Sequence, residues 1–367
     1  MKKRFLISGG GTGGHIFPAI AIANRVKKDI PDAEILFVGS NQKMEMQRVP
    51  AAGYHIKGID IYGICRDFSF NGLWHNIKLP FVLLKSLREA RRIIRTFNPD
   101  VAIGVGGFAS APALQAAISL GVPALIQEQN SYPGVTNKLL SRKVKKICVA
   151  YEGLDRYFPA SKIVITGNPI REELLNIHHH HEEAYAYFGL QADKKTLLVM
   201  GGSLGARAIN ECMREHIATL ANESLNIIWQ TGEQYYRIHK KDLKKLESSS
   251  VTIMPFIEKM NHAYSVADII ISRAGALAIA ELSVVGTPSI LIPFPFAAED
   301  HQTKNAKALA DQGAAILVAD QDVPAQLLPS LLNLIHDENL CRSLSENMKL
   351  FAKPNAMDLI FNEIMSL

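Results

Sequence analysis

The sequence predicts an α/β protein of two domains, each built on a parallel sheet, and three observations support this prediction. The chain carries a glycine-rich turn in each half, it alternates short apolar runs with helical ones, and part of its first half recurs in the second. A length of 367 residues fits two domains, because ~150 residues is a common domain size. An apolar content of 48% and a charged content of 20% are typical of a globular protein with substantial cores.

The two glycine-rich turns share one design. The first glycine turn, residues 9–15, directly follows the apolar run 5–7, and the second glycine turn, residues 201–207, directly follows the run 197–200. Each lies before a helical run, so each should present backbone N–H groups and a helix N-terminus to an anion. A tight strand-to-helix turn also favours glycine, so one such turn is weak support for phosphate binding. Two in matching frames predict two nucleotide-type, Rossmann-like domains.

Short runs made almost entirely of Val, Ile, Leu and Ala follow along the chain. They are Glu34–Val38, Val101–Val105, Ala124–Gln127, Asn226–Gln230, Asp268–Ile271 and Ser289–Ile292. Continuous apolar strands that alternate with helices predict parallel sheets buried on both faces. Ligands of such folds bind at the carboxyl ends of the strands, where the glycine turns lie.

An internal repeat sets the expected domain boundary. Residues 99–126 and 267–291 both read as an aspartate, a strand, a helix and a second strand that follows Gly-x-Pro. Turn chemistry at residues 167–169 places the boundary there, so we expect domains at 1–166 and 167–353. Residues 354–367 read as one amphipathic helix whose docking partner the sequence leaves open.

Cysteine usage and hydropathy narrow the compartment. The four cysteines are widely spaced and form no C-x-x-C pair, which fits a reducing compartment and gives no metal or disulfide framework. No apolar run approaches the ~18 residues of a membrane span. We therefore expect a cytoplasmic protein that is not integral to a membrane.

The basic excess of the chain is concentrated in one segment. Between Lys78 and Phe97 the basic residues outnumber the acidic ones by five, which equals the net charge of +5 of the whole chain. Apolar residues lead into this segment and basic ones line one face of it: Leu73, Trp74, Ile77, Phe81, Lys85, Arg88, Arg92 and Arg95. An amphipathic helix with a solvated basic side is one interpretation, and a monotopic contact with an anionic membrane is the favoured one. Nucleic acid is not expected as a partner, because no recognition motif accompanies the charge.

The first glycine turn also fits the dinucleotide pattern G-x-G-x-x-G, so an NAD enzyme is an alternative. That pattern expects an acidic side chain at the end of the second strand, and residues 39–41 offer none there. A candidate ribose carboxylate lies in the second half instead, at Glu281 on the helix after strand 268–271. A solvated glutamate is the competing interpretation of this residue.

Three further patterns bear on the chemistry. His15 lies at a predicted helix N-terminus, whose dipole disfavours imidazolium and keeps the ring able to accept a proton, although a packing role is the alternative. The run His178–His181 is interpreted as a solvated linker and not a metal site. Asp320 and Asp322 match the D-x-D of metal-dependent sugar transferases, but Asp322 precedes Val-Pro and is favoured as a helix N-cap.

Motifs spread along nearly the whole chain resemble the MurG family of bacterial N-acetylglucosamine transferases. They are GGTGGH at 10–15, GGFASAP at 106–112, EQN at 128–130, GNPIR at 167–171, GGSLGA at 201–206, RAGAL at 273–277 and DHQ at 300–302. The resemblance implies a GT-B fold, in which two Rossmann-like domains with parallel sheets face a central cleft. It also implies inverting transfer of N-acetylglucosamine from UDP-N-acetylglucosamine to the 4-hydroxyl of the N-acetylmuramyl unit of lipid I. The product would be lipid II for peptidoglycan synthesis, made without a metal or other cofactor by a peripheral protein on the cytoplasmic face of the plasma membrane.

The same resemblance implies roles for individual residues. The uridine edge would meet Ile257, the ribose diol Glu281, and the diphosphate Ser203 and Arg171, while Gln302 and Asn130 would hold the N-acetylglucosamine. Further substrate contacts would come from Thr12, Gly13, Gly14, Ala276, Leu277, Ala278, Ile279 and Ala280. The acceptor hydroxyl must lose a proton, and His15 is the expected base, with Glu128 as the alternative.

Overall fold

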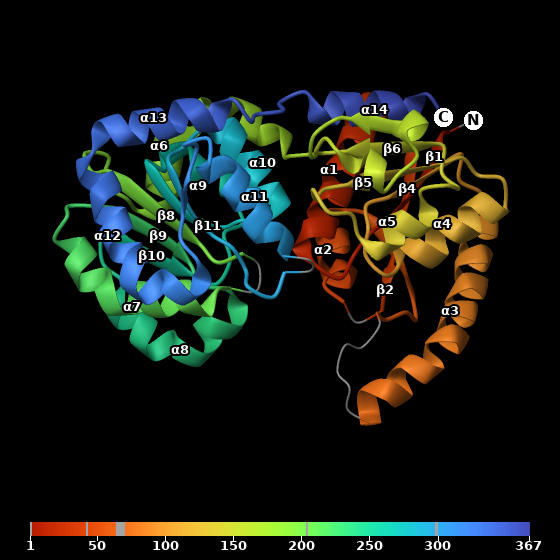
Figure 1. The fold of residues 1–367 in the computed structure, drawn as a ribbon, viewed down its shortest axis with the longest axis horizontal. Helices are drawn as coiled ribbons and strands as arrows, with labels where there is room; N and C mark the ends of the chain where they lie inside the picture. Colours follow the sequence, from red (N-terminus) through yellow and green to blue (C-terminus); the bar gives the residue numbers. More distant parts are fainter. Residues whose placement is uncertain (1, 42, 64–69, 203–204, 298–299) are drawn as a thin grey trace. The chain divides into compact units, whose positions relative to one another are not determined.

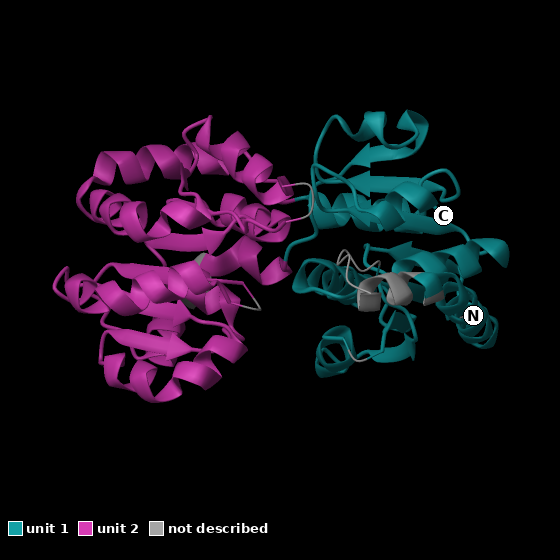
Figure 2. Ribbon diagram, turned by 60° about the horizontal axis from the view of Figure 1, so that its bottom comes forward, with its two compact units in different colours: residues 1–170, 355–367 teal, residues 171–354 magenta. Residues whose placement is uncertain are grey.

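The computed structural model describes residues 2–41, 43–63, 70–202, 205–297 and 300–367, without the side chains of residues 70–76, 78 and 178–180. The chain divides into two compact units (Figure 2). Unit 1 comprises Met1–Ile170 together with Asn355–Leu367, and unit 2 comprises Arg171–Pro354. Each unit is an α/β domain built on one sheet (Figure 1).

Unit 1 contains a seven-stranded sheet in the order β3-β2-β1-β4-β5-β6-β7, and its strand pairs are parallel. The strands are β1 (Arg4–Ser8), β2 (Glu34–Ser40), β3 (His55–Ile59), β4 (Val101–Gly104), β5 (Ala124–Glu128), β6 (Lys146–Val149) and β7 (Ile163–Ile165). Alternate residues of β1 enter different cores, with Phe5 and Ile7 in one and Leu6 in the other. Both faces are therefore buried, as the apolar runs predict.

The helices of unit 1 cover these two faces. They are α1 (Gly13–Asp29), α2 (Glu45–Ala51), α3 (Phe70–Phe97), α4 (Ser110–Ser119), α5 (Val135–Leu140) and α14 (Ala356–Met365), with the 3-10 helices η1 (Leu154–Arg156) and η2 (Ala160–Lys162). Helices α1 and α14 pack on the Phe5 side of the sheet, and α3, α4 and α5 pack on the Leu6 side. The docking partner of α14 is therefore unit 1, where Ile360 and Ile364 are buried and Asp358 pairs with Arg25 of α1.

Unit 2 repeats this topology with six parallel strands in the order β10-β9-β8-β11-β12-β13. The strands are β8 (Thr196–Met200), β9 (Asn226–Gln230), β10 (Val251–Met254), β11 (Ile269–Arg273), β12 (Ser289–Ile292) and β13 (Ile316–Leu317). The internal repeat of the sequence has a structural counterpart. Asp100 accepts a hydrogen bond from the backbone N–H of Arg4 at 2.7 Å, and Asp268 accepts one from the N–H of Thr196 at 2.7 Å.

The helices of unit 2 lie on both faces of its sheet. They are η3 (Glu172–His180), α6 (His181–Phe188), α7 (Arg207–Ala221), α8 (Glu233–Leu246), α9 (Met260–Val266), α10 (Ala276–Val285), α11 (His301–Ala310), η5 (Asp320–Asp322), α12 (Val323–His336) and α13 (Glu338–Lys349). The expected linker at His178–His181 is wrong, because this run closes η3 and opens α6. Leu174 and Ala184 on either side of it are buried in unit 2.

The described helices include none whose length and apolar content would let it cross a membrane.

Candidate functional site

The first glycine turn joins β1 to α1 at the carboxyl end of the unit 1 sheet. Gly107 packs against this turn so closely that a Cβ there would lie 2.3 Å from the carbonyl oxygen of Gly10. Thr12 is the N-cap residue of α1. Thr12 and Gly14 are exposed, whereas Gly13 is buried. The turn therefore offers Thr12 and Gly14 to a ligand from a backbone that its neighbours hold tightly.

His15 and Glu128, the two candidate bases, both lie near Asn137 in unit 1. A Cβ on Gly106 would lie 2.9 Å from Nε2 of His15 and 3.8 Å from Nδ2 of Asn137, so both side chains border this glycine. Nδ2 of Asn137 in turn donates a hydrogen bond to Oε2 of Glu128 at 2.8 Å. The residues that the sequence singles out as alternatives thus lie close to one another, with Asn137 between them.

Glu128 is a buried carboxyl group surrounded by hydrogen-bond donors. It accepts bonds from the backbone N–H of Asn130 at 3.1 Å, from Nδ2 of Asn130 at 3.3 Å and from the N–H of Gly134 at 3.0 Å, besides the bond from Asn137. Burial raises the pKa of Glu128, and these hydrogen bonds oppose that rise. The same contacts fix the side chain of Asn130, a predicted sugar contact, against the candidate base.

Glu45 also contacts the first glycine turn, and sequence reasoning missed it. Its side chain is 0% exposed, with Oε2 accepting the N–H of Gly11 at 2.9 Å and Oε1 accepting the N–H of Ser40 at 2.9 Å. A Cβ on Gly10 would lie 2.2 Å from Oε1, and a Cβ on Gly39 would lie 2.6 Å from Cγ of Glu45. The available signal was an acidic residue at the first position of the helix after β2, beyond residues 39–41.

The second glycine turn, in unit 2, is secured by the neutral side chain of Gln230 at the end of β9. Its Nε2 donates to the carbonyl oxygen of Gly202 at 3.2 Å, and its Oε1 accepts the N–H of Ile257 at 2.9 Å. Ile257 as a whole is 1% exposed and its N–H is bonded to Gln230, so its contact with a uracil ring stays a prediction. Ser203, a predicted diphosphate contact, lies outside the described residues.

Glu281, the predicted ribose ligand, lies on α10 in a compact polar cluster. The residue is 9% exposed. Its Oε1 pairs with Nε of Arg171 at 3.1 Å, and its Oε2 accepts the hydroxyl hydrogen of Tyr264 at 3.0 Å. Burial, followed by the adjacent Glu281 carboxylate, raises the pKa of Tyr264 well above its usual value, so this hydroxyl stays a donor. Two predicted donor contacts, Glu281 and Arg171, are thus directly paired, and Tyr264 is an addition from the structure.

The remaining predicted donor contacts lie at the start of α10 and on α11. Gly275 precedes α10, and a Cβ on it would meet no described heavy atom within 4 Å, so the start of the helix is open. The first residues of α10 are partly or fully buried: Ala276, Leu277, Ala278, Ile279 and Ala280. Oε1 of Gln302 accepts the N–H of Phe294 at 2.9 Å, which orients the amide nitrogen of Gln302 as the group for a ligand.

The D-x-D pair does not act as an isolated carboxylate pair. Asp320 is paired with Nη1 of Arg273 at 2.5 Å, and Asp322 occupies the N-cap position of α12. Across the described part of the chain, no three His, Cys, Asp or Glu side chains come together as metal ligands would.

The predicted membrane segment forms much of α3 in unit 1. Ile77 is 53% exposed and Phe81 is 73% exposed, although both are large and apolar. Leu73 and Trp74 also belong to α3, but their side chains lie outside the described set. The exposed apolar residues of α3 therefore include two of the four that the sequence predicts.

The basic side of α3 is also exposed, with one correction. Lys85 pairs with Asp60 at 2.8 Å, so its charge is balanced within unit 1 and contributes less to attraction of an anionic surface than the sequence suggested. Arg88, Arg92 and Arg95 are exposed and line a shallow cavity of about 380 Å³.

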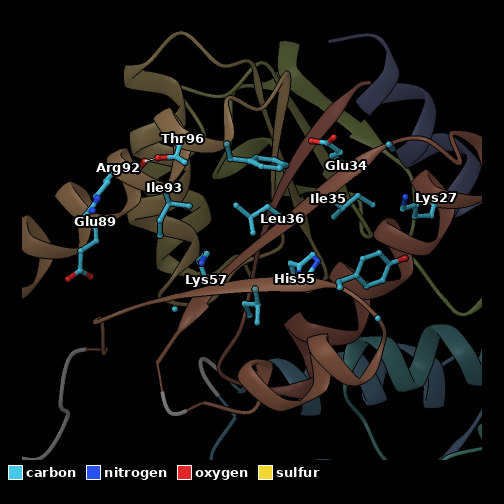
Figure 3. A pocket seen from close by; sticks show the side chains of 16 residues that line it. Lys27, Glu34, Ile35, Leu36, His55, Lys57, Glu89, Arg92, Ile93 and Thr96 are labelled. Atoms are coloured by element: carbon cyan, nitrogen blue, oxygen red, sulfur yellow. Dashed lines mark hydrogen bonds between the residues drawn. The ribbon is translucent and has the colours of Figure 1, made fainter. Parts of the chain in front are cut away.

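A larger cavity of about 1080 Å³ lies in unit 1, bounded by β2, β3 and the carboxyl half of α3 (Figure 3). Leu36 and Ile93 are among its apolar lining residues, and Lys57 and Arg92 are among the basic side chains that line it (Figure 3). Of the predicted residues only Arg92 lines it, so this cavity is separate from the candidate catalytic and substrate-binding groups.

Comparisons with known proteins cover the whole chain. Residues 5–149 match the glycosyltransferase family 28 N-terminal domain, and residues 196–360 match the glycosyltransferase family 28 C-terminal domain. The chain is similar to a protein of Parabacteroides distasonis named UDP-N-acetylglucosamine--N-acetylmuramyl-(pentapeptide) pyrophosphoryl-undecaprenol N-acetylglucosamine transferase. The two are 53% identical over 366 residues, which are 100% of this chain and 98% of the relative.

Two further comparisons agree with this one. A protein of the same name from Cytophaga hutchinsonii is 50% identical over 364 residues, covering 99% of this chain and 96% of the relative. The crystal structure of Acinetobacter baumannii MurG superposes with a TM-score of 0.73 at 32% identity and covers 100% of both chains.

Proposed function

We propose the substrates of this chain from its family, because the chain belongs to glycosyltransferase family 28. It has a GT-B fold of two Rossmann-like domains. It is a hexosyltransferase that moves N-acetylglucosamine from UDP-N-acetylglucosamine to the 4-hydroxyl of the N-acetylmuramyl unit of lipid I, which gives lipid II. This reaction serves peptidoglycan synthesis and therefore cell shape and division. The observation that carries the assignment is 53% identity to a named transferase over 366 residues.

The two halves take different substrates in this proposal. Residues 1–166, all in unit 1, form the acceptor domain, and residues 167–353, of which those from Arg171 onward are in unit 2, form the donor domain; the last helix, in residues 354–367, packs on unit 1. Support for the donor assignment comes from the polar cluster on α10. In UDP one ribose carries both the diol, on C2′ and C3′, and the diphosphate, on C5′, and Glu281 is paired with Arg171 at 3.1 Å. Glu281 accepts hydrogen bonds from the two ribose hydroxyls, and the guanidinium of Arg171 faces the diphosphate.

The other donor contacts follow from the same placement. The backbone of Ile257 meets the uracil edge, and residues 276–280 line the nucleotide site, where the open start of α10 adds the positive end of a helix dipole. Ser203 contacts the diphosphate. Gln302 and Asn130 hold the N-acetylglucosamine through their side-chain amides.

In the transfer step the acceptor oxygen forms a bond to the anomeric carbon while the bond from that carbon to the UDP oxygen breaks. His15 accepts the hydroxyl proton, and UDP leaves with the electron pair. Attack from the face opposite UDP inverts the anomeric centre. Arg171, Ser203 and the helix N-terminus stabilise the charge on the departing diphosphate, so this chemistry needs no metal ion. Glu128 is the alternative base, because burial raises the pKa of its carboxyl group. Thr12, Gly13 and Gly14 contact the substrates from the acceptor domain.

Lipid I is held in a bilayer, and the chain must reach it there. The exposed apolar residues Ile77 and Phe81, with Leu73 and Trp74, insert at the interface, and Arg88, Arg92 and Arg95 attract anionic headgroups. In this proposal the protein is peripheral and acts at the cytoplasmic face of the bacterial plasma membrane. Nucleic acid has no part in this role.

A transfer assay tests the proposal. The protein is mixed with UDP-N-acetylglucosamine and a lipid I analogue, with and without a chelator, and UDP release and the product are measured. We expect release that depends on the acceptor and persists in the chelator. Absence of acceptor-dependent release would contradict the function, and activity that returns only with Mg²⁺ or Mn²⁺ would contradict the metal-free mechanism. Tight NAD binding without UDP release would favour the dinucleotide alternative.

A further inference from the structure

Glu45 is a fully buried carboxylate with no cationic partner among the described residues, and no step of the transfer reaction uses it. Burying a charge is costly unless hydrogen bonds compensate for the lost water. Here the compensation comes from two backbone donors at 2.9 Å, the N–H groups of Gly11 and Ser40. Glu45 is also the first residue of α2, where the helix dipole favours a negative charge.

The glycines around Glu45 leave room for it. A Cβ on Gly10 would come within 2.2 Å of its carboxylate oxygen, and a Cβ on Gly39 within 2.6 Å of its Cγ. The carboxyl ends of the paired strands β1 and β2 therefore leave space for the Glu45 carboxylate. This carboxylate links the two strand ends through its hydrogen bonds to Gly11 and Ser40. Gly10 and Gly39 therefore both make space for the side chain of Glu45, which indicates a specific role for this carboxylate.

The turn that Glu45 holds is the one that positions His15. Gly11 follows directly on Gly10, whose carbonyl lies against Gly107, so the turn is fixed on one side by Glu45 and on the other by Gly107. Thr12 comes next as the N-cap of α1, and its carbonyl accepts the N–H of His15 at 3.1 Å. Any shift of Gly11 therefore moves the residues that start α1.

We propose that Glu45 is a positioning residue of the transfer reaction: by accepting the N–H of Gly11 it fixes the turn that carries Thr12 and His15. Its carboxylate acts as a built-in anion at the first glycine turn, so this turn serves placement of the base and does not bind a phosphate through Gly11. The inference rests on the proposed function, because it presupposes transfer that depends on His15.

Glu45→Gln is the direct test, because it keeps the shape of the side chain and turns one acceptor oxygen into an NH₂ group that faces a backbone donor. We expect kcat to fall by about 10- to 100-fold, since small misplacements of a reacting group have effects of this size. The dissociation constant for UDP, measured by calorimetry on the intact chain, should stay within about twofold, because donor binding rests on other residues. A role in stability alone would lower the melting temperature and leave kcat per folded molecule unchanged.

Two companion variants keep the test decisive. Gly10→Ala leaves the chemistry of Glu45 intact but pushes its carboxylate aside, and it should show the same fall in kcat with unchanged UDP binding even if Glu45→Gln folds poorly. Asp100→Asn is the matched control, because Asp100 accepts the backbone N–H of Arg4 at the opposite end of β1, and its kcat should equal that of the wild type.

The outcomes separate this inference from its premise. A wild-type chain that transfers while Glu45→Gln and Gly10→Ala keep full kcat would overturn the inference alone. Equal losses of kcat and of UDP binding would overturn it too, because the carboxylate would then support the whole fold. A wild-type chain without transfer would overturn the proposed function and this inference with it.

Discussion

Units 1 and 2 share a strand order, a glycine turn after the first strand of the repeat and an aspartate that caps the start of that strand, but they secure the turn in opposite ways. In unit 1 the carboxylate of Glu45 takes the N–H of Gly11. In unit 2 the amide of Gln230 donates to the carbonyl of Gly202, which is the corresponding residue of the repeat. The turn of unit 1 is held by a carboxylate that accepts one of its backbone N–H groups. The turn of unit 2 is held by a neutral amide that donates to one of its backbone carbonyls.

This difference bears on which N–H groups of each turn are available to the donor diphosphate in the proposed function. A glycine turn binds a phosphate by pointing N–H groups at it, and a carboxylate on one of those groups both occupies the donor and repels the anion. Among the described residues of unit 2, the side chain that contacts the turn is the neutral amide of Gln230. We therefore expect the side chain beside each turn, as well as the glycines that the two turns share, to affect whether the N–H groups of that turn bind the donor diphosphate.

The units also differ in the helix between their third and fourth strands. In unit 1 this helix is α3, with 28 residues, and in unit 2 it is α9, with 7 residues. Each helix lies in the crossover connection from the third to the fourth strand of its own sheet. Helix α3 carries the exposed apolar and basic residues Ile77, Phe81, Arg88, Arg92 and Arg95, so unit 1 is the unit for which we propose the membrane contact.

Removing the base from unit 1 should have the largest effect. His15→Ala should lower kcat by roughly 10²- to 10⁴-fold, because general base catalysis contributes this much, while UDP binding to the other unit survives. Steady-state kinetics and calorimetry measure the two quantities. His55→Ala, an exposed histidine on β3, is the control. Near-normal turnover of His15→Ala across pH 6–9 would move the base elsewhere, with Glu128 next in line.

Removing positive charges from α3 should weaken membrane binding and leave both glycine turns intact. Changing Arg88, Arg92 and Arg95 to Gln should weaken binding to anionic vesicles by about 1 kcal/mol for each residue, because each charge loses its attraction to the surface. Vesicle sedimentation at low and high salt measures this. The control changes Lys240, Lys241 and Lys244 of α8, which removes the same charge from unit 2. Equal losses in both variants would show that net charge, and not α3, governs binding.

The nucleotide site of unit 2 is tested by Glu281→Ala. We expect donor affinity to fall by about 1–3 kcal/mol, because the ribose hydroxyls lose their acceptor. Calorimetry with UDP-N-acetylglucosamine measures the change, and Glu247→Ala, an exposed residue of the same unit, is the control. Unchanged affinity would remove Glu281 from the donor site.

The sequence predicts most of this architecture but only part of the site. Strands β9 and β12 have the bounds that their apolar runs predict, whereas the other four runs differ from their strands by one or two residues at one or both ends, because polar residues and glycines also extend a strand. Glu45 was missed because its role needs α2 to fold back onto the ends of β1 and β2, and no local pattern records that contact. For the same reason the sequence gives no sign that Lys85 is paired, since its partner Asp60 lies on another segment.

Giving unit 2 a carboxylate beside its glycine turn, as unit 1 has, should have a smaller effect than the three changes above. Gln230→Glu places a carboxylate beside the second glycine turn, and repulsion of the diphosphate should weaken UDP binding by roughly tenfold, less at high salt. Uridine, which lacks phosphate, is the control ligand and should lose little affinity. If UDP binds the variant as tightly as the wild type, the charge beside the turn does not decide which unit takes the anion.

The smallest effect concerns the stability of unit 1 against pH. Burial raises the pKa of Glu128 above its ordinary value of 4.5, so the folded chain holds this proton more tightly than the unfolded chain. The stability that Glu128 contributes is therefore complete below the ordinary pKa and is lost as pH rises through the raised one. In denaturant titrations at increasing pH, the free energy of unfolding of Glu128→Gln should fall less than that of the wild type. Parallel curves would show that Glu128 does not titrate differently in the two states.

Hydrogen–deuterium exchange of the intact chain with UDP tests the contrast between the two glycine turns most directly. We expect slower exchange on UDP addition in residues 273–281 of unit 2, where the start of α10 is proposed to meet the nucleotide, and no change in residues 9–15 of unit 1. Protection of residues 9–15 without protection of 273–281 would contradict this expectation, because the anion would then bind at the turn that already holds the carboxylate of Glu45.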